Sequence, residues 1–309
     1  MKKIFLLICT LVVIFFSACG KTEEKADIEL DTSKRQLIET SIDVYVNEED
    51  AVDYANGECG QNVTWRLSEN GVLVISRSGE MNNFPYDDYV PWHDFRDMIV
   101  EVKIKSGVTS IGRYAFQSCN NLETVTMADT VVKMEYSAFQ NCTSLRVIDL
   151  SDSIEELPKQ AFSDCTELES IELPKNLQRV QDYAFCDCIS LKEVTFTEKT
   201  WYIANDVFRE CSALETVYFP DILKVIGCTT FAFCDNLQTI TIPAKVKNLS
   251  DTFLKCRELK EVYFKGDAPV ISDRTFKEVT ATCYYPSGNR TWTISKMSDY
   301  GGNLTWVAE

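Results

Sequence analysis

A phenylalanine that recurs every 23 residues constrains the fold of this chain more than any other feature of its sequence. The Phe column comprises Phe116, Phe139, Phe162, Phe185, Phe208, Phe231, Phe253 and Phe276. A leucine follows six residues later in seven units, at Leu122, Leu145, Leu168, Leu191, Leu214, Leu237 and Leu259. The interval from Phe231 to Phe253 is one residue shorter than the others. A unit of this length cannot bury its own apolar face, so successive units must stack on one another.

Each unit also contains a short segment in which apolar and mostly polar residues alternate. The first core column is Val102, Val125, Ile148, Ile171, Val194, Val217, Ile240 and Val262. The second core column is Ile104, Met127, Leu150, Leu173, Phe196, Phe219, Ile242 and Phe264. This alternation is typical of a half-buried strand. We therefore expect about eight stacked coils whose equivalent strands pair in parallel at a spacing of about 4.8 Å.

The stretches SIGRYAFQSCNNLETVTM, SAFQNCTSLRVIDL, AFSDCTELESIELP and YAFCDCISLKEVTF resemble the BspA-like leucine-rich repeats of bacterial surface proteins. The resemblance extends over residues 99–282. It implies a leucine-rich-repeat solenoid in which each coil has one β-strand and a short helix or 3-10 turn. Members of this group are associated with adhesion to host extracellular-matrix proteins and to other cells, which is the role that the resemblance implies here.

The segments on either side of the repeats are expected to cap the open ends of the solenoid, which would otherwise expose its core. Residues 57–98 are assigned to an N-terminal β cap, because Val63, Trp65 and Leu67 alternate before the turn sequence SENG and a second strand follows. Residues 283–309 lose the Phe column, become aromatic and rich in turn residues, and are assigned to a C-terminal cap.

The chain begins MKKIFLLICTLVVIFFSACGK, in which the apolar run from Ile4 to Ala18 is shorter than the ~20 residues that span a bilayer as a helix. Small residues directly before Cys19 resemble the lipobox of bacterial lipoproteins, although Phe16 stands where that motif usually has leucine. We therefore predict a signal peptide over residues 1–18, lipidation of Cys19, and an exported protein anchored at the cell membrane. The alternative is an ordinary signal peptide and a freely secreted protein.

Residues 19–56 are predicted to be an acidic linker, since residues 20–56 contain eleven acidic and four basic side chains. Within it, SIDVYV at 41–46 alternates like a strand and is a candidate to dock on the body. Loss of residues 1–18 removes Lys2 and Lys3, leaving 29 basic and 47 acidic residues and a net charge of −18. This charge disfavours nucleic acid and anionic lipid as partners, so we expect membrane contact only through the N-terminal lipid.

Cysteine forms a second periodic series, the Cys column, made of Cys119, Cys142, Cys165, Cys188, Cys211, Cys234 and Cys256. One cysteine per coil gives a line of sulfur atoms rather than the converging ligands of a zinc site. Parallel side chains also suit a disulfide poorly, because that bond needs a strongly twisted geometry. We predict free thiols packed as small apolar groups. Alignment with long polar residues in other coils predicts that Cys186 and Cys228 are exposed, and the redox states of Cys59, Cys186, Cys228 and Cys283 stay open.

No catalytic residue, cofactor or metal is predicted. His93 is the single histidine of the chain, and its aromatic neighbours favour a packing role in the cap over a catalytic one. Carboxylates are numerous, but on a solenoid they are usually solvated, and no phosphate-binding glycine loop is present.

The strand residues between the two core columns must point away from the core onto the open face of the sheet. This open-face column is Lys103, Thr126, Asp149, Glu172, Thr195, Tyr218, Thr241 and Tyr263. A parallel side column is Glu101, Thr124, Val147, Ser170, Glu193, Thr216, Thr239 and Glu261. Threonine suits an exposed strand by propensity alone, whereas tyrosine supplies contact area at low entropic cost.

The candidate ligand surface is therefore Asp149, Glu172, Glu193, Thr195, Tyr218 and Tyr263. The expected partner is a protein, either of the host matrix or of another cell surface, and a glycan is the second possibility. Two other functions fit the same sequence: a structural spacer of the envelope, and an accessory that holds glycan or peptide for a partner hydrolase. The oligomeric state is left open.

Overall fold

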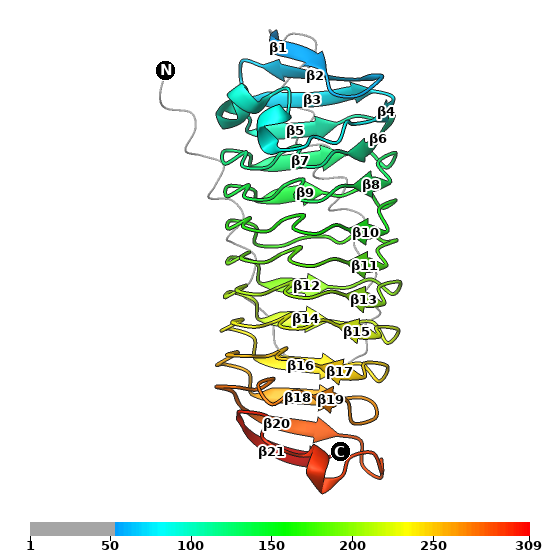
Figure 1. Ribbon diagram of the computed structural model, residues 1–309, viewed down its shortest axis with the longest axis vertical. Helices are drawn as coiled ribbons and strands as arrows, with labels where there is room; N and C mark the ends of the chain where they lie inside the picture. Colours follow the sequence, from blue (N-terminus) through cyan, green and yellow to red (C-terminus); the bar gives the residue numbers. More distant parts are fainter. Residues whose placement is uncertain (1–52) are drawn as a thin grey trace, which may run out of the picture. The chain divides into compact units, whose positions relative to one another are not determined.

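The computed structural model describes residues 53–309, which form a long stack of coils (Figure 1). The predicted signal peptide, Cys19 and the strand-like residues 41–46 lie outside the described residues. Within residues 53–309, no helix is long and apolar enough to cross a membrane.

Each coil contributes one main strand to a parallel sheet. The main strands of the repeats are β5 (Glu101–Ile104), β7 (Thr124–Met127), β9 (Val147–Asp149), β12 (Glu193–Thr195), β14 (Thr216–Tyr218), β16 (Thr239–Ile242) and β18 (Glu261–Phe264). Neighbouring strands pair in the register of the repeat, so that Val102 faces Val125 and Val125 faces Ile148. The first core column therefore stacks on itself and is buried, apart from the half-buried Ile171. The predicted leucine-rich-repeat solenoid is confirmed.

A second, shorter strand follows in each coil and stacks into sheets on the adjoining side (Figure 1). These strands are β6 (Val108–Ile111), β8 (Lys133–Met134), β10 (Glu156–Leu157), β11 (Arg179–Val180), β13 (Tyr202–Ile203), β15 (Val225–Ile226), β17 (Asn248–Leu249) and β19 (Val270–Ile271). Among the described residues, the 3-10 helices η1 (Asp87–Tyr89), η2 (His93–Met98) and η3 (Ile294–Lys296) all lie in the caps. The coil thus differs in one detail from the expectation, because it has no helix of its own.

A turn with two left-handed residues takes the place of that helix. Tyr114 and Ser118, two residues before and after Phe116, have φ angles of 60° and 58°. This backbone lets alternate amides face the next coil, so that Phe116 N donates to Ala138 O at 2.8 Å and Ser118 N donates to Gln140 O at 2.9 Å. Equivalent positive φ angles recur at Ser137, Asn141, Gln160, Asp164, Tyr183, Asp187, Asp206, Glu210, Thr229, Phe233, Asp251, Lys255 and Glu278. Each such residue costs about 1 to 3 kcal/mol in backbone strain, which the hydrogen bonds between coils offset.

The Phe column forms a continuous aromatic stack through the core. All eight rings are fully buried, and neighbouring ring centroids lie 5.0 to 5.9 Å apart in stacked orientation. Trp92 continues the stack into the N-terminal cap, with its ring 5.5 Å from that of Phe116. Its indole Nε1 donates to Ala115 O at 2.8 Å, which satisfies the one polar atom of this buried side chain.

The N-terminal cap is an antiparallel unit that joins the main sheet. It contains β1 (Asp53–Glu58), β2 (Val63–Ser68), β3 (Val72–Arg77) and the two-residue β4 (Gly79–Glu80), and β3 pairs in parallel with β5. The strand β1 begins at residue 53, inside the range expected to be linker, because its backbone pairs with β2.

The main sheet also continues into the C-terminal segment, as β20 (Thr280–Tyr285) and β21 (Asn303–Ala308). The boundary expected at residue 283 therefore falls inside a strand. The Phe column ends one coil later, where Phe276 N donates to Tyr300 O and Gly301 takes the position of the next phenylalanine. Gly301 has a φ of +85°, and a Cβ there would lie 2.7 Å from Asp273 O, so only glycine fits.

Two interruptions divide the main sheet. The coil between β9 and β12 makes only an isolated bridge from Ser170 to Glu193, and β14 and β16 belong to separate sheets. Pro174, Pro220 and Pro243 stand at equivalent positions after the strand segments of three coils, although β14, which precedes Pro220, still pairs with β12. At the equivalent position Ala128 N donates to Ile104 O at 3.0 Å, a bond that proline cannot make. The open face is therefore less regular around Glu172 than elsewhere.

Candidate binding face of the solenoid

The main sheet carries the predicted ligand residues on one face. Asp149, Glu193 and Thr195 are exposed residues of strands β9 and β12, and Tyr218 on β14 is 55% exposed. Thr195 lies beside Tyr218 in the strand register. Glu172 is exposed as well, but it belongs to the coil whose main strand is interrupted. Strand register and the alternation of buried and exposed residues therefore bring the six candidates onto a common surface.

The middle of this face is acidic. Glu193 accepts a hydrogen bond from Thr216 Oγ1 at 3.3 Å. Among the described residues, no lysine or arginine forms an ion pair with Glu172 or Glu193. Val147, on strand β9 two coils before Glu193, is 52% exposed. The face thus combines uncompensated carboxylates with exposed apolar and aromatic area.

Tyr263 differs from Tyr218, although both belong to the open-face column. Its ring stacks on Tyr284 with centroids 4.7 Å apart and planes 8° apart. Its hydroxyl donates to Glu261 Oε2 at 3.0 Å, and this hydrogen bond raises the pKa of Tyr263. Tyr263 is half-buried and held in place, whereas the ring of Tyr218 extends into solvent.

The open-face column extends two strands beyond the surface expected from the sequence. Tyr284 on β20 lies beside Tyr263, and Val307 on β21 lies beside Tyr284, so the open-face column continues into the C-terminal cap. We missed this extension because the cap has lost the Phe column that marks each coil. The alternation in TATCYY at 280–285, where Ala281 and Cys283 are buried, is the signal that indicates it.

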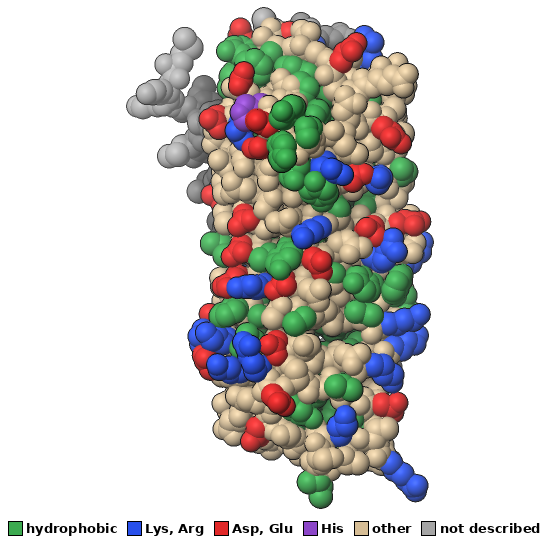
Figure 2. All heavy atoms as spheres, in the orientation of Figure 1, with side chains coloured by type: hydrophobic (Ala, Val, Ile, Leu, Met, Phe, Trp, Pro, Cys, Tyr) green, Lys and Arg blue, Asp and Glu red, His purple; other side chains and the backbone are tan. Residues whose placement is uncertain are grey.

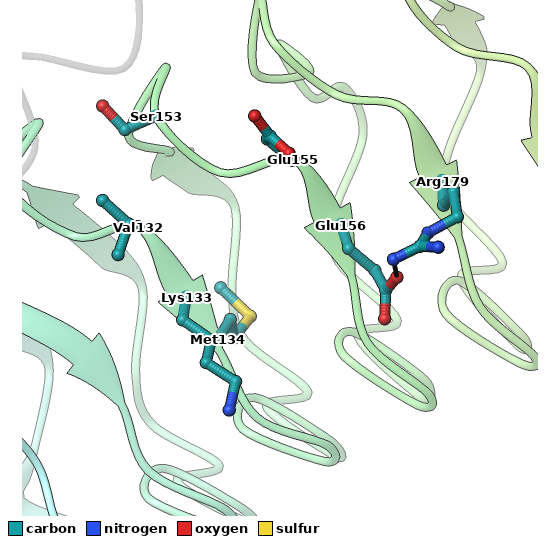
Figure 3. A pocket seen from close by; sticks show the side chains of 7 residues that line it. All are labelled: Val132, Lys133, Met134, Ser153, Glu155, Glu156 and Arg179. Atoms are coloured by element: carbon teal, nitrogen blue, oxygen red, sulfur yellow. Dashed lines mark ion pairs between the residues drawn. The ribbon is translucent and has the colours of Figure 1, made fainter.

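A hollow of about 480 Å³ lies on the other side of the coils, where the short strands β8 and β10 belong to different sheets (Figure 3). Its lining residues are Val132, Lys133, Met134, Ser153, Glu155, Glu156 and Arg179. Figure 3 shows the ion pair between Glu156 and Arg179, whose charged atoms lie 2.6 Å apart. Lys133 pairs with Glu135 at 2.5 Å, a hydrogen bond that raises the pKa of Lys133. The hollow contains none of the predicted ligand residues.

The prediction of free, packed thiols in the Cys column is confirmed: all seven are unpaired and buried. Each thiol after the first donates to the carbonyl oxygen of a phenylalanine in the preceding coil, as Cys188 Sγ does to Phe162 O at 3.1 Å. Burial raises the pKa of Cys119 to about 12 and raises the pKa of the other six as well. These thiols therefore stay protonated at neutral pH and satisfy buried carbonyl groups.

The prediction that Cys186 is exposed is wrong: only 7% of its surface is exposed, and its Sγ donates to Asp187 Oδ2 at 3.1 Å. The equivalent Gln117 and Arg209 reach outward because their side chains are long, whereas the short cysteine is covered by neighbouring coils. Cys228 is half-buried, 3.7 Å from Ser250 Oγ. Cys59 and Cys283 are buried free thiols whose pKa burial raises to about 12.

His93 lies in the N-terminal cap, where its ring contacts Asp87 O at 3.1 Å and Arg96 Nη2 at 3.3 Å. Both partners are structural, since Arg96 also pairs with the carboxylate of Asp87 at 3.0 Å. Across residues 53–309, no group of three histidine, cysteine or acidic side chains is placed to hold a metal ion.

Comparison with known proteins gives a family match. The BspA type leucine rich repeat region matches in six copies, over residues 95–212 and 179–291. No curated protein matches the chain.

Several solved structures are similar at low identity. A leucine-rich repeat protein from Eubacterium ventriosum is 21% identical over 75% of this chain and 85% of that one, with a TM-score of 0.36. The leucine rich repeat protein of T. pallidum is 22% identical over 72% and 85%, with a TM-score of 0.42. A leucine rich cell surface protein from Faecalibacterium prausnitzii is 16% identical over 79% and 96%, with a TM-score of 0.39.

Proposed function

This chain belongs to the BspA-type leucine-rich-repeat family, and on that premise we propose that it binds a protein partner at the cell surface through the open face of its main sheet. The observation that carries the proposal is the composition of that face. Glu172 and Glu193 lack a basic partner among the described residues, and Tyr218, on the strand that pairs with the strand of Glu193, exposes more than half of its surface. Stacked repeats present such a face as one extended binding surface.

The chemistry of the face indicates the kind of partner. Carboxylates without a neighbouring cation attract a basic surface, and the exposed side chains of Val147 and Tyr218 supply apolar contact area on either side of Glu172 and Glu193. A folded protein that presents lysine or arginine between apolar residues meets both requirements. Extracellular-matrix proteins of a host are the first candidates, because adhesion to them is associated with the family.

We further propose that the protein is exported and anchored by a lipid on Cys19. The short apolar run before Cys19 and the acidic residues after it support this arrangement. Mass spectrometry of the native N-terminus tests it: we expect a diacylated or triacylated cysteine as the first residue. An unmodified terminus downstream of Cys19 would contradict the anchor and leave the binding proposal intact.

We propose no catalytic activity for the protein. Leucine-rich-repeat solenoids are typically binding scaffolds, and His93 is engaged with Asp87 and Arg96 in the cap. Turnover of any peptide, ester or glycan by the purified chain, abolished by His93→Ala, would overturn this part of the proposal.

A protein and glycan array probed with the chain from residue 20 onward tests the binding proposal, because this form lacks only the predicted signal peptide and lipidation site. We expect saturable binding to at least one protein. Glu172→Lys with Glu193→Lys should weaken that binding at least about tenfold, since like charges then face the partner. The matched control is Glu69→Lys with Asp273→Lys, which makes the same charge change at exposed positions off this face.

Two outcomes would favour the other functions. The absence of saturable binding to any protein or glycan would support a spacer role in the envelope. Binding to glycans alone, lost in Tyr218→Ala and Tyr263→Ala, would support a glycan-holding accessory instead.

A further inference from the structure

The side of the solenoid formed by the short strands β11, β13, β15 and β17 has a composition of its own. In this part of each coil four side chains point outward, at positions 175, 176, 178 and 179 and at the equivalent positions of the next three coils. Six of these sixteen positions are lysine or arginine and two, Glu198 and Asp221, are acidic, although the chain carries a net charge of −16. We define the basic edge as Arg179, Lys199, Trp201, Lys224, Lys245 and Lys247. Figure 2 shows lysine and arginine spheres gathered along the right-hand edge, where Figure 1 labels these strands.

The cations in the middle of the basic edge are not neutralised. Arg179 and Lys247, at its two ends, pair with Glu156 and Asp267 of the flanking coils at 2.6 and 3.3 Å. Lys199, Lys224 and Lys245 are exposed and form no ion pair with any carboxylate in residues 53–309. The edge therefore presents a line of positive charge on a chain that repels anions elsewhere.

An aromatic ring lies within this line of charge. Trp201 is half-buried, and its ring centroid lies 5.7 Å from that of Tyr202. Lys224 Nζ, on the next coil, lies 5.9 Å from the Trp201 ring centroid. Lys224 and Lys247 are equivalent residues of adjacent coils, so the cations recur along the axis at a spacing of about 4.8 Å. A half-buried indole ring beside these two cations is suited to contact a sugar ring while the cations bind its acidic substituents.

We infer that the basic edge binds a linear acidic polysaccharide, laid along the solenoid axis across strands β11 to β17. A thin polymer contacts this edge without approaching the acidic open face. A folded acidic protein is broad enough to meet the carboxylates of the flanking coils, such as Glu155 and Asp267, and is repelled by them. A nucleic acid duplex meets the same obstacle. The inference does not depend on the proposed protein partner, since the two surfaces share no residue.

Binding of the full-length chain to oligomers of polygalacturonate and to a sulfated glycosaminoglycan tests the inference. We expect saturable binding to a carboxylated or sulfated glycan, weakened by salt, and none to uncharged dextran. Lys199→Ser with Lys224→Ser should reduce the affinity about tenfold or more, because two unpaired cations are lost. The control is Lys192→Ser with Lys260→Ser, which removes two exposed lysines that lie outside the basic edge and pair with Glu169 and Glu258, and it should leave the affinity unchanged.

Trp201→Leu separates stacking from charge, since leucine keeps an apolar side chain but lacks a ring face. It should weaken glycan binding several-fold at an unchanged unfolding midpoint. The inference is overturned if neither glycan binds, if the control variant weakens binding as much as the test variant, or if polyglutamate or duplex DNA binds as tightly as the glycan.

Discussion

The inside and the outside of each coil obey different rules. Inside, the Phe column repeats one residue type in all eight coils, and the Cys column repeats another in seven. Outside, the open-face column contains lysine, threonine, aspartate, glutamate and tyrosine, and the basic edge differs again. An inner side chain must pack against its equivalents in the coils above and below, so the same residue type is required in successive coils. An outer side chain is not required to match its equivalents in this way, so the fold allows its residue type to differ from coil to coil.

The largest expected effect is alkaline unfolding driven by the buried thiols. Burial raises the pKa of Cys59, Cys119 and Cys283 from about 9 to about 12, and raises it further for others. Between these values the unfolded chain loses thiol protons that the folded chain keeps, so stability falls as pH rises from about 9 toward 12. Each such thiol contributes a slope of about 1.4 kcal/mol per pH unit.

Urea unfolding at several pH values measures this slope. Cys142→Ala with Cys165→Ala should flatten it by about 3 kcal/mol per pH unit, whereas Thr195→Ala, which removes no titratable group, should leave it nearly unchanged. An equal slope in the double variant would show that other groups cause the alkaline loss.

The next largest effect is expected in the aromatic stack. Phe185→Ala removes a fully buried ring that lies 5.4 Å from both Phe162 and Phe208, and should cost about 3 to 5 kcal/mol in the free energy of unfolding. On the outside of a coil, Tyr218→Ala should change that free energy by no more than about 0.5 kcal/mol. Chemical denaturation measures the free energy of unfolding of both variants. Similar losses in the two would contradict the distinction between inner and outer columns.

A smaller effect separates two roles of the Cys column. Cys188→Ala leaves Phe162 O without its donor and should cost about 1 to 3 kcal/mol. Cys188→Ser keeps a donor at the same position and should cost less than alanine. A hydroxyl already bonds to a buried carbonyl elsewhere in this core, where Thr230, at the position equivalent to Ala184, donates to Ala204 O at 3.1 Å. If serine is the more damaging substitution, the thiol acts by apolar packing alone.

The inner columns could be predicted from sequence because their period and residue types are visible there. The turn around Phe116 could not, because nothing in Tyr114 or Ser118 signals a positive φ angle: hydrogen bonds between coils impose it. The burial of Cys186 could not be predicted for a related reason, because it depends on how far the side chains of adjacent coils extend over the thiol. Both failures concern contacts made only after stacking.

The ends of the solenoid were harder to predict than its middle. Trp92 stands 24 residues before Phe116 and extends the aromatic stack, but a change of residue type hides it from a search for phenylalanine. The basic edge was overlooked because its lysines do not form one strict column. The six predicted ligand residues do share a face, since alternation along a strand determines that; whether they bind is a question for experiment.

The central claim is that the buried columns determine the stability of the fold, whereas the residues of the open face determine binding. The most direct test measures both properties of Glu172→Lys with Glu193→Lys: its unfolding midpoint and its affinity for the protein identified on the array. The account predicts an unchanged midpoint and an affinity at least about tenfold lower. An unchanged affinity, or a loss of affinity matched by the Glu69→Lys and Asp273→Lys control, would contradict it.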